Sequence, residues 1–129
     1  MLELRYRRTW IALVWLLAAL IVVASLMPGG QMPGPQGIDK LGHFTAYFTL
    51  TTLSAGIVAR ATIPWVVVWV ILLGLAMEAA QALLTDTRTA DWADALANTI
   101  GVLSAWWLVR GRVGWAMAAE AWLAGRRHH

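Results

Sequence analysis

The chain has 129 residues, of which 60% are hydrophobic, 13% are charged and nine are tryptophan, and its formal net charge is +3. A soluble domain of this length cannot hide so much apolar surface in a single core, so the composition predicts a membrane protein. The sequence contains no cysteine, which excludes disulfides, thiol nucleophiles and cysteine-ligated metals.

Four apolar segments follow one another along the chain, each close to the roughly 20 residues that cross a bilayer as a helix. They cover residues 9–27, 42–59, 63–84 and 92–109. Proline and glycine at 28–30 and 33–35, Arg60 with Pro64, and a polar run at 85–89 separate them. No internal repeat is visible, so residues 1–129 are expected to form one domain. We predict an all-α membrane protein, a compact bundle of four transmembrane helices.

The C-terminal segment 110–127 is too short and too polar at its ends to be a fifth span. Arginines bracket an apolar stretch that contains Trp115 and Trp122. This pattern predicts a short interfacial helix on the membrane surface. His128 and His129 follow it and are assigned no role.

Lysine and arginine are distributed unevenly between the two sides of the predicted bundle. One side holds eight of them, Arg5, Arg7, Arg8, Arg60, Arg110, Arg112, Arg126 and Arg127, and the other holds Lys40 and Arg88. The positive-inside rule therefore predicts a multi-pass protein of the cytoplasmic (inner) membrane with both termini in the cytoplasm. The net charge thus indicates topology, not a nucleic-acid partner. Residues 1–26 could instead be a cleaved signal peptide, but the apolar run is long and no A-x-A site follows it.

Polar residues gather on three predicted helices at the extracytoplasmic end. An ionisable group in hydrocarbon costs about 2.5 kcal/mol or more, so several of them imply a shared site. Residues spaced three or four apart share a helix face. The residues concerned are Asp39, Lys40, His43 and Tyr47 on the second segment, Glu78 and Gln81 on the third, and Asp91, Asp94 and Asn98 on the fourth.

Each aspartate also has a plain structural explanation. Asp39 and Asp91 stand where N-caps belong, and capping alone would explain either of them. Asp94 could complete a cap-like pair with Asp91 or balance Arg88. A role for Asp94 in function is only slightly favoured over these alternatives.

The remaining polar residues differ in how easily packing explains them. His43 could be a satisfied structural histidine, and Tyr47 an interfacial aromatic. Gln81 and Asn98 could hold helices together by hydrogen bonds. Glu78 is the hardest to explain in this way, because its short side chain lies well inside its segment and needs a partner.

The order of these residues resembles the VanZ-like family of small bacterial membrane proteins over about residues 9–109. The pattern is Ser25-x-x-Pro28, Asp39-Lys40-x-x-His43-Phe44-x-x-Tyr47-Phe48-x-Leu50, Glu78-x-x-Gln81, Arg88, and Asp94-x-x-Ala97-Asn98-x-x-Gly101. The resemblance implies that the family's polar positions are Asp39, Lys40, His43, Tyr47, Glu78, Gln81, Arg88, Asp94 and Asn98. Asp91 departs from the family pattern, where serine is more usual. The family is named for an association with teicoplanin resistance, and the resemblance implies no particular reaction.

The chemistry of the cluster suggests a lipid ligand. Cations at the outer boundary can bind phosphate or sugar headgroups, and His43 and Glu78 can move protons. The expected partner is a membrane lipid or lipid-linked glycan of the cell envelope, such as one carried on polyprenyl phosphate. In an enzyme, His43 would be the acid/base or nucleophile, and Glu78 and Asp94 would be base or orienting carboxylates. The remaining positions would bind the substrate or its anionic group: Asp39, Lys40, Tyr47, Gln81, Arg88 and Asn98.

Three alternatives stay open at this point. The chain could be a non-catalytic protein that sequesters a lipid or shields against an amphiphilic antibiotic. Proton-coupled transport is less favoured, because no line of acidic groups continues towards the cytoplasmic half. A divalent metal could be held by His43, Glu78 and Asp94, but no spacing matches a recognised metal signature, so no cofactor is predicted.

Overall fold

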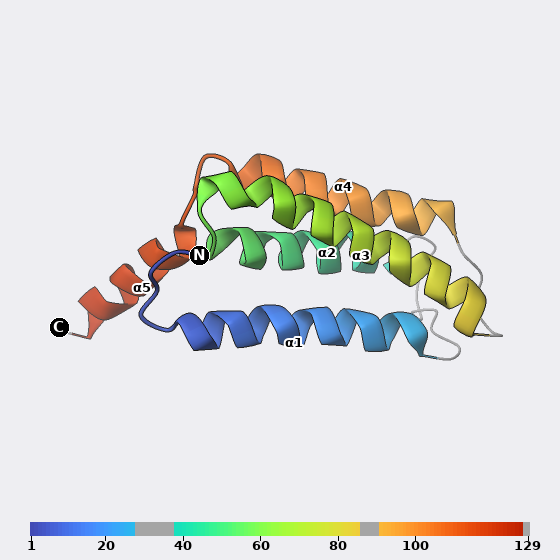
Figure 1. Cartoon of the computed structure of the whole chain (residues 1–129), viewed down its shortest axis with the longest axis horizontal. Helices are drawn as coiled ribbons and strands as arrows, with labels where there is room; N and C mark the ends of the chain where they lie inside the picture. The colour runs from blue at the N-terminus through green and yellow to red at the C-terminus, as the bar shows by residue number, and fades with distance from the viewer. Residues whose placement is uncertain (28–37, 86–90, 128–129) are drawn as a thin grey trace.

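The computed structural model describes residues 1–27, 38–85 and 91–127, and the regular structure in these ranges is entirely helical. The elements in chain order are α1 (Arg7–Leu26), α2 (Ile38–Gly56), the 3₁₀ turn η1 (Arg60–Thr62), α3 (Ile63–Leu84), α4 (Trp92–Val109) and α5 (Trp115–Arg126). The four long helices run side by side and alternate in direction (Figure 1). The N-terminus, α5 and the α2–α3 and α4–α5 connections lie at one end of the bundle, and the first turns of α2 and α4 lie at the other.

Helix α2 is the central element, because it packs against α1, α3, α4 and α5. Its most extensive contact is with α4, and Gly101 explains how the two helices come so close. A Cβ atom at Gly101 would lie 2.5 Å from the carbonyl oxygen of Phe44 and 3.2 Å from the backbone nitrogen of Phe48. Since only glycine lacks that atom, the backbones of α2 and α4 can touch here.

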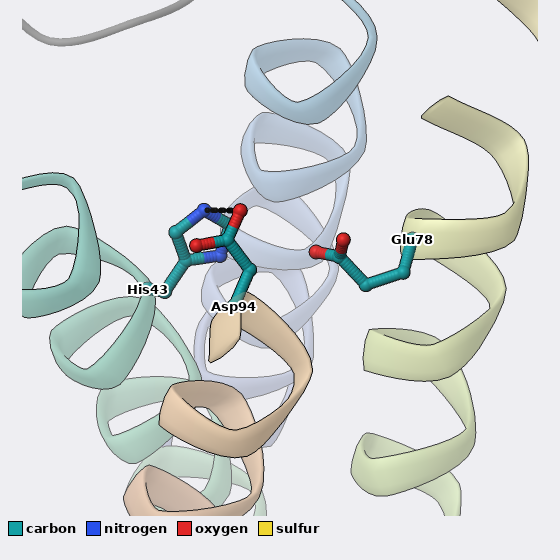
Figure 2. A group of neighbouring side chains, drawn as sticks. All are labelled: His43, Glu78 and Asp94. Carbon is teal, nitrogen blue, oxygen red and sulfur yellow. Dashed lines mark ion pairs between the residues drawn. The ribbon is translucent and has the colours of Figure 1, made fainter. Parts of the chain in front are cut away.

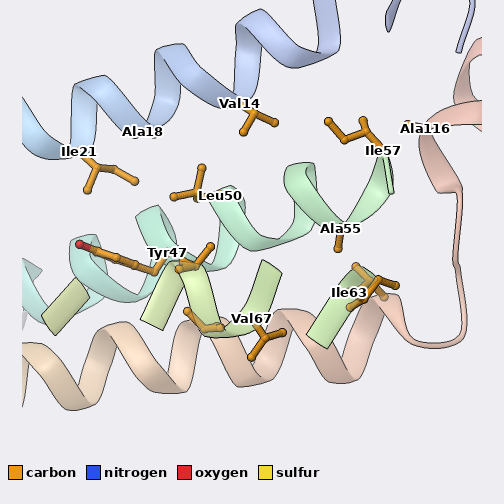
Figure 3. Close-up of a cluster of buried hydrophobic side chains, with 13 residues drawn as sticks. Val14, Ala18, Ile21, Tyr47, Leu50, Ala55, Ile57, Ile63, Val67 and Ala116 are labelled. Carbon is orange, nitrogen blue, oxygen red and sulfur yellow. The ribbon is translucent and has the colours of Figure 1, made fainter. Parts of the chain in front are cut away.

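The apolar core runs along the middle of the bundle. Tyr47, Leu50, Val70 and Val102 are almost fully buried. Figure 3 shows side chains of α1, including Val14, facing α2 across this core.

The outer surface of the bundle is also apolar. Large hydrophobic side chains on α1 and α3 are well exposed, among them Trp15, Leu20, Trp65 and Leu72. A soluble protein would not leave such a surface to water, whereas a bilayer covers it. The exposed faces therefore indicate a membrane protein.

Two of the described helices are long and apolar enough to cross a membrane by length and composition alone, the segments Arg7–Leu26 and Arg60–Leu84. The prediction of four spans is therefore supported only in part. Helices α2 and α4 are less apolar because they carry polar residues, among them His43 and Asn98. These two residues face each other inside the bundle. Contact with a neighbouring helix keeps such groups away from the apolar outer surface.

The helix boundaries also needed correction. The first segment was placed at 9–27 and is helical over Arg7–Leu26, and the second was placed at 42–59 and is helical over Ile38–Gly56. Asp39 thus lies inside the first described turn of α2 and not at an N-cap, a position that suits its negative charge. The boundaries of the third and fourth helices, 63–84 and 92–109, are confirmed.

The predicted C-terminal helix within 110–127 is present as α5, and a buried carboxylate fastens it to the N-terminus. Glu120 accepts hydrogen bonds from the backbone N–H groups of Arg5 (2.7 Å) and Tyr6 (3.0 Å) and from the indole N–H of Trp10 (2.7 Å). Burial alone would raise the pKa of Glu120, but these donors hold its pKa below the usual value. Glu120 was not among the residues predicted from the sequence to have a role.

Candidate functional site

The polar cluster forms where the first turns of α2 and α4 meet the last turns of α3. The side chain of Lys40 is the centre of its outer part. Its ammonium contacts Asp39 at 3.2 Å, Asp91 at 2.8 Å and also Asp94. About a third of the lysine side chain is exposed, so this part of the cluster reaches the surface.

His43 lies one turn further along α2 and bridges to α4. Its Nδ1 is 3.0 Å from Oδ1 of Asn98, and its Nε2 is 3.5 Å from Oδ2 of Asp94. With its amide oxygen turned towards the ring, Asn98 can accept a hydrogen bond from the Nδ1–H of His43. Nε2 is then the nitrogen turned towards Asp94.

Glu78 enters the cluster from α3 and is only 6% exposed. One oxygen, Oε2, accepts a hydrogen bond of 3.2 Å from the backbone N–H of Asp91. The other, Oε1, is buried and has no hydrogen-bond partner in the described part of the chain. Figure 2 shows its carboxylate pointing towards His43 and Asp94.

These three residues bring their ligand atoms together. One atom each from His43, Glu78 and Asp94 lies within 4.8 Å of the other two. An imidazole and two carboxylates can exchange protons at this range, and they are also donors that divalent cations accept.

Two further polar atoms beside the cluster have no partner within residues 1–27, 38–85 and 91–127. They are the hydroxyl of Tyr47, which is 2% exposed, and Nδ2 of Asn98, which is 3% exposed. Both residues lie against Gly74, where a Cβ atom would be 3.2 Å from the Tyr47 ring and 3.4 Å from Asn98. Tyr47 is therefore a core residue and not the interfacial aromatic that the sequence allowed.

The structure thus brings together most of the predicted site residues: Asp39, Lys40, His43, Tyr47, Glu78, Asp94 and Asn98. Gln81 points elsewhere, because its amide nitrogen donates to the backbone oxygen of Ser25 at 3.0 Å and so ties α3 to the end of α1. Arg88 lies outside the described residues.

Asp91 was counted in the predicted polar cluster but given no binding or catalytic role, and the structure makes it part of the site's geometry. As the N-cap of α4 it accepts the N–H of Ala93 at 2.9 Å, and its second oxygen binds Lys40. The Lys40 ammonium, helped by the Ala93 N–H, holds the pKa of Asp91 below its usual value. Its spacing three residues before Asp94 was the available signal, but capping alone explained that spacing.

An all-α bundle with an apolar outer surface and a polar cluster at one end defines a helical membrane protein. The profile of the VanZ/LLP1 family matches residues 4–115, and the chain belongs to that family. The resemblance seen in the sequence is thereby confirmed. Comparison with curated proteins gave no match. Comparison with solved structures gave none either.

Proposed function

We propose that the chain crosses the bacterial cytoplasmic membrane four times, with both termini in the cytoplasm, and binds the headgroup of a lipid-linked cell-envelope molecule at the extracytoplasmic face. Helices α1 to α4 are each long enough to span, and His43 of α2 and Asn98 of α4 face each other inside the bundle. Eight arginines belong to the segments at the end of the bundle opposite the polar cluster (Figure 1). The positive-inside rule places that end in the cytoplasm and the cluster outside.

The observation that carries this proposal is that three of the four buried polar side-chain atoms without partners in the described part of the chain lie at the cluster: Oε1 of Glu78, Nδ2 of Asn98 and the Tyr47 hydroxyl. The fourth, Oγ of Ser54, is near the other end of α2. Leaving such a group unsatisfied costs about 1–3 kcal/mol, and more when it is charged. Three of them beside His43 and Asp94 support a site that is completed by a polar ligand.

The depth of the cluster favours a lipid as the source of that ligand. Lys40 and Asp91 form a partly exposed rim, whereas Glu78 and Asn98 lie deeper inside the bundle. A lipid whose tail stays in the bilayer would present its headgroup at this level. A polyprenyl phosphate carrying a glycan is the envelope lipid whose phosphate and hydroxyl groups match these donors and acceptors.

If the bound molecule is also processed, the roles follow from the contacts. His43 is held by Asn98 and Asp94, so it would act as acid/base or nucleophile, and Glu78 and Asp94 would orient it or accept its proton. Binding alone needs none of these steps, and the proposal rests on binding.

Thermal unfolding of the purified protein in detergent tests the proposal. Polyprenyl phosphate should raise the melting temperature, and polyprenol, which has the same chain without the phosphate, should not. Glu78→Gln should abolish the rise, while Glu120→Gln, the same change at the other end of the bundle, should leave it intact. Equal stabilisation by both lipids, or full stabilisation of Glu78→Gln, would contradict the proposal.

A further inference from the structure

The polar cluster carries more negative than positive charge. In the part of the chain that the structure describes, the single ammonium of Lys40 is shared by Asp39, Asp91 and Asp94, and Glu78 adds a fourth carboxylate nearby. A phosphate approaching this cluster would meet carboxylates and a lysine that is already engaged. The charges therefore suit a cation better than an anion.

Among the described residues, a neutral His43 leaves the deepest part of the cluster without a donor. In the tautomer whose Nδ1–H is directed to Asn98, the Nε2 lone pair faces Asp94 at 3.5 Å. The carboxylate of Glu78, with its unpartnered Oε1, points into the same space (Figure 2). Three acceptors that face one another are a suitable setting for a bound cation.

We propose that His43, Glu78 and Asp94 bind a divalent transition-metal cation of the Zn²⁺ or Mn²⁺ class. One imidazole nitrogen and two carboxylate oxygens are a usual donor set for these ions, and three protein ligands leave a coordination position open. Ligand bonds of about 2.1 Å put neighbouring ligand atoms roughly 3.4 Å apart, which is the His43 to Asp94 distance already present. All three ligand atoms lie within 4.8 Å of one another, so a small movement of the Glu78 side chain would bring it into coordinating range.

The surroundings of the three ligands support the assignment. Asn98 binds the other nitrogen of His43, Lys40 binds the second oxygen of Asp94, and the Asp91 N–H binds the second oxygen of Glu78. Each ligand is therefore oriented by a hydrogen bond on its far side, as metal ligands usually are.

This site deepens the proposed function and, in its link to the lipid, rests on it. A bound cation would offer its open coordination position to the phosphate of the headgroup. It would also supply positive charge, since the ammonium of Lys40 is already paired with aspartates. The partly exposed side chains of Asp91 and Lys40 mark the side from which ion and headgroup would enter.

Isothermal titration of the purified, EDTA-stripped protein with Zn²⁺ and, separately, Mn²⁺ tests the site without any lipid. The only other histidines are His128 and His129, so all samples should carry alanine at both positions and no affinity tag. One equivalent is expected to bind, and His43→Ala, Glu78→Gln and Asp94→Asn should each weaken binding at least about 100-fold. Glu120→Gln should bind as the parent does.

Two further measurements separate loss of a ligand from loss of the fold. Asn98→Ala removes no ligand and should weaken binding only about 10–100-fold. Electron spin echo of bound Mn²⁺ should show coupling to an imidazole nitrogen. No binding by the parent, equal binding by the three ligand variants, or absence of the nitrogen coupling would overturn the site.

The same samples distinguish the two proposals. Stabilisation by polyprenyl phosphate should disappear after EDTA treatment and return with the metal. Stabilisation that survives EDTA would refute the bridging role of the cation and leave lipid binding standing. Metal binding without any stabilisation by the lipid would refute the proposed function and leave the metal site standing.

Discussion

Asp91 shows how a single side chain can serve two structural purposes at the mouth of a site. One of its oxygens caps α4 through the Ala93 N–H, and the other binds the Lys40 ammonium. Its backbone N–H also holds Glu78. Capping could be predicted from the sequence, because aspartate precedes a helical segment. The two contacts to other helices could not, because they depend on how α2 and α3 approach α4.

The lowered pKa of Asp91 leads to a prediction about acid stability. Folding lowers the pKa of this carboxylate. Its charged form therefore stabilises the folded protein at pH values above the unfolded-state pKa of about 3.9, and this contribution is lost as the pH falls. Asp91→Asn keeps the cap but loses the charge that faces Lys40. The variant should therefore melt at a lower temperature than the parent at pH 7, and the difference should shrink as the pH falls through the lowered pKa of the folded state. A difference that stays constant across this range would show that the charge of Asp91 is not involved.

At the scale of elements, the pairing of α2 with α4 positions the site. His43 meets Asn98 and Asp94, and Lys40 meets Asp91, only because these two helices lie in backbone contact. Gly101 permits that contact and lies two turns after Asp94 along α4. Gly101 and Ala105 are small residues one turn apart on α4, a pattern that favours close packing but does not specify the partner helix.

Gly101→Ala should therefore damage the site from a distance. The added Cβ would collide with the Phe44 carbonyl, and overpacking of this kind costs about 1–3 kcal/mol. The melting temperature and metal affinity of the variant should both fall. Gly125→Ala is the matched control, because that glycine is also helical and has no atom within 4 Å of the added carbon. Equal behaviour of the two variants would mean that α2 and α4 tolerate separation.

Helix α5 depends on one anchoring residue. Glu120→Ala removes the acceptor shared by Arg5, Tyr6 and Trp10 and leaves their three N–H groups without it. We expect trypsin to cleave the variant after Arg112 severalfold faster than the parent. Metal affinity should stay unchanged, since the cluster lies at the opposite end of the bundle. Unchanged cleavage would show that other contacts, such as the Trp115 indole on the Thr52 carbonyl, suffice to hold α5.

At the scale of the whole molecule, eight of the nine arginines belong to segments at the end of the bundle opposite the polar cluster. This separation orients the protein in the proposed topology and predicts where introduced thiols will react. The chain has no cysteine of its own, so single replacements are clean probes. Cysteine at Gly30 or Thr87, both outside the described residues, should react with an impermeant reagent from the periplasm, and cysteine at Gly125 should not. Labelling of all three from one side would contradict the four-span topology.

The sequence by itself determined the class of protein, the number of long helices and the polar residues that are candidates for the site. Apolar length, charge asymmetry and helical spacing are local properties, and residues such as Glu78 and His43 stand out wherever the chain folds. Only the tertiary structure decided which of these residues meet. In the fold, Gln81 donates to the Ser25 carbonyl, and Asp91 binds Lys40 at the site. Tyr47 is buried in the core, and Glu120 accepts a hydrogen bond from the N-terminal segment. These contacts join residues far apart in the chain, so they follow from helix packing and not from the spacing of side chains on any one helix.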